Sequence, residues 1–238
     1  MITTELLLVR HGQARCNVAG IVGGPRTCTG LTDQGRIEIQ LAADRIAAEY
    51  PGTPHITTVY TGPRLRLRQS AEILAHTLKV PVVVEPGLDG PIHGDADGRT
   101  WREITANFRG HPQAHPDRPW AASSDTWNNF LSRATAFLAE LLSRVASQRI
   151  LVAAHGETVI AAHSLLLSLP LGSPVRFTVD HASLTRWQHQ HNRFGHESWW
   201  LDCHNDTSHL DMRRHGARGG RSTPCSEGQT TDVKEQTG

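Results

Sequence analysis

Short apolar runs recur along the first two thirds of the chain. The first, residues 6–9, is continuous and apolar, which is typical of a strand buried on both faces. Further strands are predicted at 56–61, 80–85, 150–154, 177–179, 184–188 and 198–201. The last of these are expected to form antiparallel hairpins.

Helical periodicity fills most of the spaces between these runs. Thr32 is placed to cap a helix whose apolar residues share one face as far as Ile46. Other helices are predicted at 67–78, at 124–145 and at 158–169. Because strands and helices alternate, we expect an α/β fold, a three-layer α/β/α sandwich around a mostly parallel sheet.

The stretch from 87 to 120 lacks such periodicity and is rich in Gly and Pro. Long irregular segments of compact domains are usually functional, so residues 87–125 are predicted to form a small cap. The domain is expected to span residues 1–211, and the polar, Gly-rich stretch 212–238 is expected to be a disordered tail. Four aromatic residues either line the cap or pack in the core: Trp101, Phe108, Trp120 and Trp127.

The composition excludes several classes of protein. The chain has 24 Lys and Arg against 23 Asp and Glu, without the basic excess of a nucleic-acid-binding or membrane-surface protein. No run approaches the ~18 apolar residues of a membrane span, and no signal-peptide pattern opens the chain. We therefore expect a cytoplasmic protein, and its Ala, Arg and Gly content is typical of a GC-rich bacterial source. A homodimer remains open.

Cysteines and histidines give no convincing metal site. The four cysteines, Cys16, Cys28, Cys203 and Cys225, lack Cys-x-x-Cys spacing. Free thiols are expected, since a Cys16–Cys28 bridge has nothing else to support it. His189 and His191 would share one face of a strand, but no third ligand is placed near them, so a solvated face is the better interpretation. We expect neither a metal nor a cofactor.

Three separated segments carry residues that can bind an anion. Each lies at the end of a predicted strand or at the start of a predicted helix. They are Arg10-His11-Gly12 with Asn17 six residues after the histidine, Tyr60 to Ala71 with Arg66 at its centre, and Val152 to Gly156 with His155. In open α/β sheets, ligands bind beyond the carboxyl ends of the strands. His11 and His155 are therefore expected to meet at one edge of the sheet.

This combination resembles the histidine phosphatase (phosphoglycerate mutase-like) superfamily. That family has a strand ending in Arg-His-Gly, a stretch like Ser-Pro-Leu-x-Arg, and a later strand ending in His-Gly. The resemblance covers roughly residues 5–210, and Asp125-Thr126 with Arg133 fits where the family often has Gly-Glu-Ser and an arginine. It implies a metal-independent phosphatase that acts on a small phosphorylated metabolite.

By this resemblance, His11 is the catalytic residue that takes up the phosphoryl group. The substrate-binding residues would be Arg10, Asn17, Arg66 and His155. The chemistry agrees, because guanidinium forks match phosphate oxygens and a neutral imidazole can attack phosphorus. A second imidazole can stabilise the charge of the transferring group.

One position departs from the family pattern. The family's catalytic acid lies in a segment Leu-x-Glu-x-x-x-Gly-x-x-x-Gly, and aligning Gly94 and Gly98 puts Gly90 at the glutamate position. Two other catalytic carboxylates could replace it: Asp89, the preceding residue, and Glu157, which follows the second histidine by two residues. The third explanation is weakened hydrolysis, which would affect poor leaving groups most. The nearby His93, Asp95 and Asp97 are expected to be solvent-facing loop residues.

Three functions therefore remain in view. The first is hydrolysis of a small phosphomonoester through a phosphohistidine intermediate. The second is a phosphoglycerate mutase-type phosphotransferase, disfavoured because that group's longer basic and aromatic signature is not evident. The third is a phosphate-binding or biosynthetic protein whose hydrolysis is weakened by Gly90.

Overall fold

A six-stranded sheet with the order β3-β2-β4-β1-β5-β6 forms the centre of the molecule. The structure, a computed structural model, describes residues 2–51, 56–146 and 148–211; the predicted tail lies outside them. The strands are β1 (Ile2–Arg10), β2 (Ile56–Thr61), β3 (Val82–Val84), β4 (Arg149–Ala154), β5 (Leu184–His191) and β6 (Glu197–Asp206). The first four are parallel neighbours, and β5 runs antiparallel to both β1 and β6.

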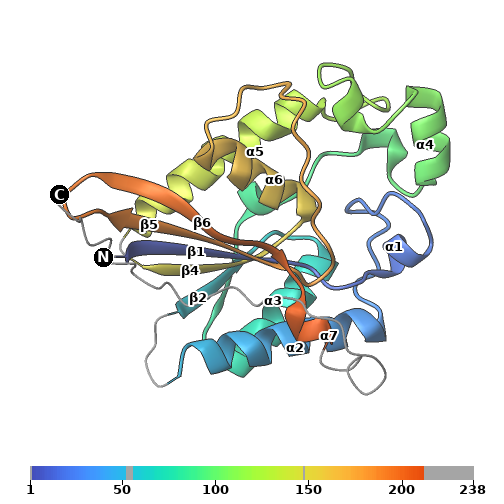
Figure 1. The fold of residues 1–238 in the computed structure, drawn as a ribbon. Coiled ribbons are helices and arrows are strands. Elements are labelled where there is room, and N and C mark those ends of the chain that lie inside the picture. The colour runs from blue at the N-terminus through green and yellow to red at the C-terminus, as the bar shows by residue number, and fades with distance from the viewer. Residues whose placement is uncertain (1, 52–55, 147, 212–238) are drawn as a thin grey trace.

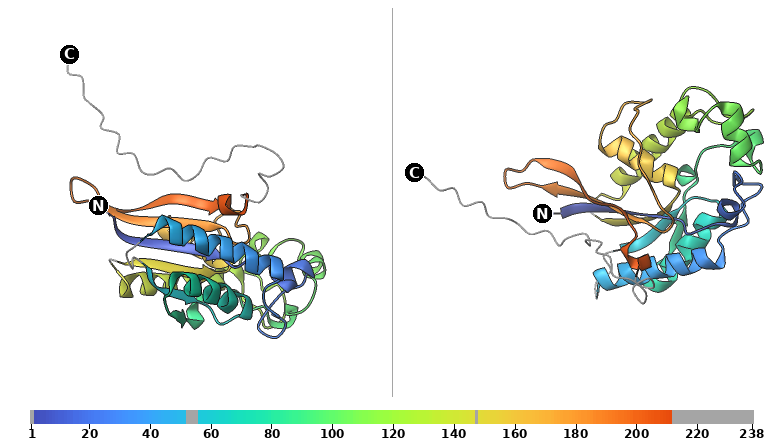
Figure 2. Two further views of the ribbon diagram at one scale, coloured as in Figure 1. Left: turned by 90° about the horizontal axis from the view of Figure 1, so that it is seen from below. Right: turned by 45° about the vertical axis from the view of Figure 1, so that its right-hand side comes forward.

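Helices cover both faces of this sheet (Figure 1). One face carries α2 (Asp33–Glu49) and α3 (Leu65–Leu78), and the other carries α5 (Trp127–Arg144) and α6 (Gly156–Leu166). Side chains of β1 alternate between the two resulting cores, which is why its apolar run is continuous. The two further views in Figure 2 show the same layers. The predicted three-layer α/β fold is confirmed.

Two shorter helices lie beyond the carboxyl ends of the strands, and a third follows β6. They are α1 (Arg15–Val18), α4 (Trp101–Phe108) and α7 (Ser208–Asp211). The sequence prediction missed α4 because its segment looked irregular. Its start is nevertheless marked by a capping box, in which Thr100 accepts a hydrogen bond from the Glu103 N–H and the Glu103 carboxylate accepts one from the Thr100 N–H.

The cap has an apolar cluster of its own, made by Val22, Ala96, Ile104, Phe108 and Trp120. Two of the four aromatic residues therefore pack inside the cap, while Trp127 belongs to the core under α5. Trp101 is partly buried and stacks on the ring of His111, with 5.9 Å between centroids. Core packing is thus the main role of these aromatics.

The loop around residues 19–30 is tied to the cap through one carboxylate. The Asp97 side chain is only 2% exposed and accepts hydrogen bonds from the Gly24 N–H and the Arg26 N–H, both at 2.9 Å, and from the Thr27 hydroxyl. The prediction that Asp97 faces solvent was wrong, because these three protein donors form the hydrogen bonds that water would otherwise give its carboxylate. Asp95 is exposed, as predicted.

The segment that joins α6 to β5 also differs from the prediction. Residues 177–179 were expected to form a strand but have no ladder partner. Instead, the Val179 carbonyl accepts a hydrogen bond from the Arg10 side chain, and the Ser183 carbonyl accepts one from the Arg10 backbone N–H at 3.1 Å. This segment therefore crosses the carboxyl end of β1, where the side chains of interest gather.

Candidate active site

His11 and His155 meet at the carboxyl ends of two neighbouring parallel strands. Arg10 of β1 lies in register with Ala154 of β4, so the residues that follow are adjacent. The ring centroids of His11 and His155 are 5.4 Å apart, and their planes are nearly perpendicular at 83°. Both side chains are buried. The structure thus brings together two histidines that are 144 positions apart (155 − 11) in the sequence.

The ring of His11 is oriented by two hydrogen bonds. Nδ1 lies 2.8 Å from the Gly12 carbonyl oxygen, which can only accept, so Nδ1 carries the proton. Nε2 then has a free electron pair, and it accepts a hydrogen bond from Arg66 Nε at 3.2 Å. Burial, together with the charges of Arg66, His155 and Arg10, holds the pKa of His11 well below its usual value. His11 is therefore neutral at neutral pH.

Arg66 comes from the first turn of α3 and is buried. Besides contacting His11, it donates a hydrogen bond to the Gly23 carbonyl at 2.7 Å and another to the side chain of Cys28. Cys16, Cys28 and Cys203 are free thiols, as predicted, while Cys225 lies outside the described residues.

Arg10 is contacted by His181, a residue that the sequence analysis missed. The Arg10 guanidinium donates a hydrogen bond to the Val179 carbonyl and lies 3.3 Å from Nε2 of His181. The His181 ring centroid is 5.8 Å from that of His11. Burial and the Arg10 charge lower the pKa of His181 to about 4, so its Nε2 is free to accept. No motif in the sequence marked His181, because it lies in an aperiodic segment.

A second residue that the sequence analysis missed, Arg64, lies beside His155. Its Nε is 2.8 Å from Oδ1 of Asp89, and the same carboxylate oxygen lies 3.5 Å from Nε2 of His155. Arg64 also lies 3.2 Å from the ring nitrogen Nε2 of His93. The prediction that His93 faces solvent was wrong, because this contact and the cap bury it. The sign of this further cation in the sequence was that Arg64 stands two positions before Arg66.

Gly90 faces the same space. A Cβ atom built on it would lie 2.8 Å from Cδ2 of His155 and 3.4 Å from a terminal nitrogen of Arg64. A side chain at position 90 would therefore point directly at the second histidine. This placement agrees with the alignment of Gly90 to the family's glutamate.

Glu157 lies in the first turn of α6 and is half-buried. Burial alone would raise the pKa of its carboxyl group, but Arg10, a backbone N–H, His93 and Arg66 together lower it. Glu157 is thus ionised beside the cations of the site. Asn17 is different: it is exposed on α1, and the hydrogen bond recorded for its side chain comes from the Ala14 N–H at 3.0 Å.

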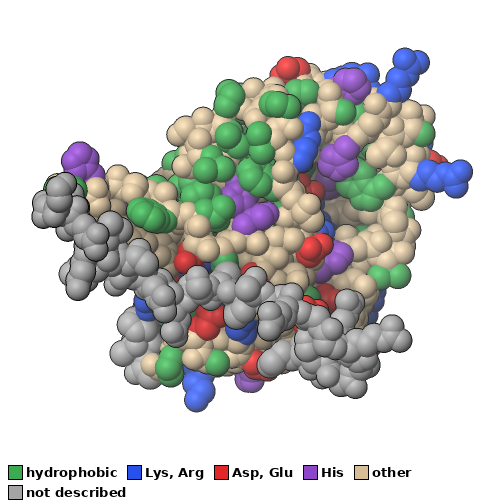
Figure 3. All heavy atoms as spheres, viewed as in Figure 1, with side chains coloured by type: hydrophobic (Ala, Val, Ile, Leu, Met, Phe, Trp, Pro, Cys, Tyr) green, Lys and Arg blue, Asp and Glu red, His purple; other side chains and the backbone are tan. Residues whose placement is uncertain are grey.

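Figure 3 shows histidine, arginine and acidic side chains close together where the surface is hollowed beside the cap. Over residues 2–51, 56–146 and 148–211, no group of three or more His, Cys, Asp or Glu side chains is arranged to hold a metal ion. The side chains gathered in the site are mainly imidazoles and guanidinium groups.

The same described residues contain no helix with the length and apolarity needed to cross a bilayer.

The profile of the histidine phosphatase superfamily (branch 1) matches residues 6–202. The chain belongs to the histidine phosphatase superfamily. One similar protein is the "Probable phosphoglycerate mutase GpmB" of Photorhabdus laumondii, 25% identical over 215 residues that cover 87% of this chain and 95% of that protein.

Solved histidine phosphatase structures have the same fold. A mycobacterial glucosyl-3-phosphoglycerate phosphatase complexed with VO3 matches with a TM-score of 0.71 and 23% identity, covering 84% of this chain and 98% of that one. The phosphoserine phosphatase of Entamoeba histolytica matches with a TM-score of 0.67 and 19% identity, covering 87% and 99%. At these identities the likeness concerns the fold.

Proposed function

We propose that this histidine phosphatase hydrolyses a small phosphorylated metabolite through a phosphohistidine at His11. The observation that carries the proposal is the unprotonated Nε2 of His11, which faces Arg66 at 3.2 Å beside a second buried histidine. A neutral imidazole is the form that can attack phosphorus. Arg66 would move its hydrogen bond from Nε2 to a phosphate oxygen when the substrate enters.

The other residues of the site bind and neutralise the phosphoryl group in this proposal. Arg10 and Arg66 supply guanidinium forks for the phosphate oxygens, and His155 donates a hydrogen bond to an oxygen on which charge accumulates. Asn17 would add an amide at the rim after a rotation of its side chain. Two carboxylates of the site have parts in this proposal: Glu157 takes part in proton transfer, and Asp89 neutralises Arg64 beside His155.

A phosphoglycerate mutase is the second candidate, favoured by the name of the Photorhabdus relative. A mutase returns the phosphoryl group from the histidine to its substrate, whereas a phosphatase passes it to water. With 3-phosphoglycerate as substrate, release of inorganic phosphate identifies hydrolysis, and formation of 2-phosphoglycerate identifies the mutase.

The test of the main proposal is phosphate release from p-nitrophenyl phosphate and from a panel of phosphorylated metabolites. We expect turnover that persists after dialysis against EDTA and is abolished in His11→Ala. His196→Ala, which changes an exposed histidine of the β5–β6 hairpin, is the matched control and should keep full activity. Turnover that survives in His11→Ala, or no turnover of any substrate, would refute the proposal.

A further inference from the structure

Position 90, which aligns with the family's catalytic glutamate, carries no side chain in this protein. Gly90 offers no carboxyl group, and its Cα faces His155 so closely that an added Cβ would lie 2.8 Å from Cδ2 of that ring. His155 and Arg64 therefore occupy the space next to position 90. A proton donor for the leaving oxygen would have to come from Asp89 or Glu157.

Asp89 is engaged in an ion pair that opposes this role. Its Oδ1 lies 2.8 Å from Nε of Arg64, whose side chain is 2% exposed. A carboxyl group that donates a proton must carry one first, and protonated Asp89 would leave a buried guanidinium without its counter-charge. Breaking a buried pair in this way is strongly unfavourable. The ion pair therefore commits the Asp89 carboxylate to Arg64.

Glu157 is also held in its ionised form. Burial would raise the pKa of its carboxyl group, but the positive charge of Arg10, a backbone N–H and the charge of Arg66 outweigh burial and lower it. The imidazoles are no better as acids: burial and Arg64 lower the pKa of His93 to about 4. Burial and nearby cations likewise keep the pKa of His155 well below its usual value. Among the described residues of the site, neither Glu157 nor the imidazoles of His93 and His155 are thus held in their protonated form at neutral pH.

From this geometry we infer that the substrates are phosphoryl compounds whose leaving oxygen departs as a stable anion, namely acyl phosphates and aryl or enol phosphomonoesters. The inference rests on the proposed phosphatase function and narrows its substrate class. Simple alkyl phosphates, including sugar phosphates, are then poor substrates, because an alkoxide leaves slowly without general acid catalysis.

The reaction balances without an acid. The electron pair of His11 Nε2 forms the N–P bond, and the P–O bond to the leaving group breaks with its pair retained by the leaving oxygen. Water then attacks phosphorus, the N–P bond returns its pair to Nε2, and the water proton passes to a carboxylate and on to solvent. Glu157, being ionised, suits this second step as the base. The products are the leaving-group anion, hydrogen phosphate and one proton.

The test compares kcat/KM of the same enzyme for substrates that differ in their leaving group. We expect kcat/KM to be high for acetyl phosphate and p-nitrophenyl phosphate, lower for phenyl phosphate, and roughly 10²–10⁴-fold lower for glycerol phosphate than for p-nitrophenyl phosphate. If acetyl phosphate alone is turned over, the class narrows to acyl phosphates and the inference holds. Glycerol phosphate turned over within about tenfold of p-nitrophenyl phosphate would overturn the inference while leaving the proposed function intact. No turnover of any compound would overturn both.

Variants of the two carboxylates give an independent check. Asp89→Asn and Glu157→Gln should leave the ratio of kcat/KM between p-nitrophenyl and glycerol phosphate unchanged, because neither residue acts as an acid. Glu157→Gln should instead lower kcat and produce a burst of leaving group, since its phosphoenzyme would react with water more slowly. A loss of activity confined to glycerol phosphate in either variant would identify that carboxylate as the acid and contradict the inference.

Discussion

Arg66 shows how one buried side chain can fix the orientation of an imidazole, that of His11. Its Nε bonds to Nε2 of His11, and a terminal nitrogen bonds to the Gly23 carbonyl, so the guanidinium plane is fixed from two sides. Its charge is also the second largest cause of the lowered pKa of His11, after burial. The same residue therefore orients the imidazole and favours its neutral form, and in the proposed function it also binds the phosphate.

Arg66→Lys tests this role at the scale of one residue. Lysine keeps the charge but loses the planar fork, so we expect kcat/KM for p-nitrophenyl phosphate to fall on the order of 10²-fold. Arg68→Lys is the matched control, since Arg68 lies on the same helix with its side chain 52% exposed and makes only a long ion pair with Glu72. Equal activity of both variants with the wild type would show that Arg66 does not bind the phosphoryl group.

The sequence could identify residues whose place follows from a strand end, but not those placed by irregular segments. His11 and His155 each follow a predicted strand, so the sequence placed them at the same edge of the sheet, and the structure shows that the two strands are neighbours. Arg64 and His181 were missed, because the first is buried by the cap and the second sits in a segment without periodicity. Spacing showed that Gly90 departs from the family, but not that Asp89 pairs with Arg64.

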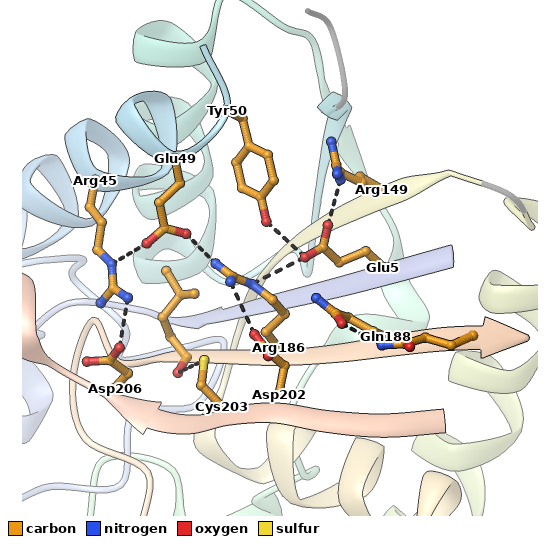
Figure 4. Close-up of polar contacts among 12 residues, drawn as sticks. Glu5, Arg45, Glu49, Tyr50, Arg149, Arg186, Gln188, Asp202, Cys203 and Asp206 are labelled. Carbon is orange, nitrogen blue, oxygen red and sulfur yellow. Dashed lines mark hydrogen bonds and ion pairs between the residues drawn. The ribbon is translucent and has the colours of Figure 1, made fainter. Parts of the chain in front are cut away.

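Among the elements, α2 is joined to the sheet by a network of charges at the amino end of β1 (Figure 4). Glu5 of β1 is buried and contacts Arg149 Nε at 2.6 Å, Arg186 Nε at 3.3 Å and the Tyr50 hydroxyl at 2.9 Å. Glu49, on the last turn of α2, also pairs with Arg186. This network lies at the end of β1 opposite to the site.

Glu5→Ala should therefore destabilise the fold without touching the chemistry. It removes the ion pair of Arg149, while Arg186 keeps its pairs with Glu49 and Asp202, so we expect the free energy of unfolding, measured with urea, to fall by about 3 kcal/mol. Glu72→Ala, which removes one partner of an exposed pair, should change it by no more than about 0.5 kcal/mol. A Glu5 variant as stable as the wild type would mean that the network contributes nothing net.

Element prediction succeeded where a segment buries a regular apolar face. The strand from 6 to 9 and the stripe of α5 have this pattern, and both are present. Residues 177–179 resemble a strand in composition, yet they pair with no strand, and the Val179 carbonyl accepts a hydrogen bond from Arg10 instead. The helix α4 was hidden because only its capping box and two buried residues, Ile104 and Phe108, distinguish it.

At the scale of the whole molecule, several histidines are buried in neutral form. Burial is the first cause of the lowered pKa of each, with values of about 4 for His93, His163 and His181. The pKa values of His11 and His155 are lowered still more clearly. Above the ordinary histidine pKa of ~6.5 these groups are neutral in both folded and unfolded chains. Below it, only the unfolded chain takes up their protons.

The free energy of unfolding should consequently fall as the pH drops from about 6.5 towards 4. Each such histidine contributes up to about 1.4 kcal/mol per pH unit in this window. His163→Gln, placed in the core away from the cations of the site, should reduce the slope by about one histidine's share. Urea unfolding across this pH range measures the slope, and a stability independent of pH there would contradict the burial of neutral histidines.

The central claim is that His11 carries the phosphoryl group during turnover. The most direct measurement is to mix the Glu157→Gln variant with p-nitrophenyl phosphate, quench within milliseconds in alkali, and locate phosphate by peptide mass spectrometry. The account predicts an alkali-stable, acid-labile phosphoryl group on the peptide containing His11, and none in the variant that also carries His11→Ala. Phosphate on another residue, or turnover with no phosphoenzyme at any time, would contradict it.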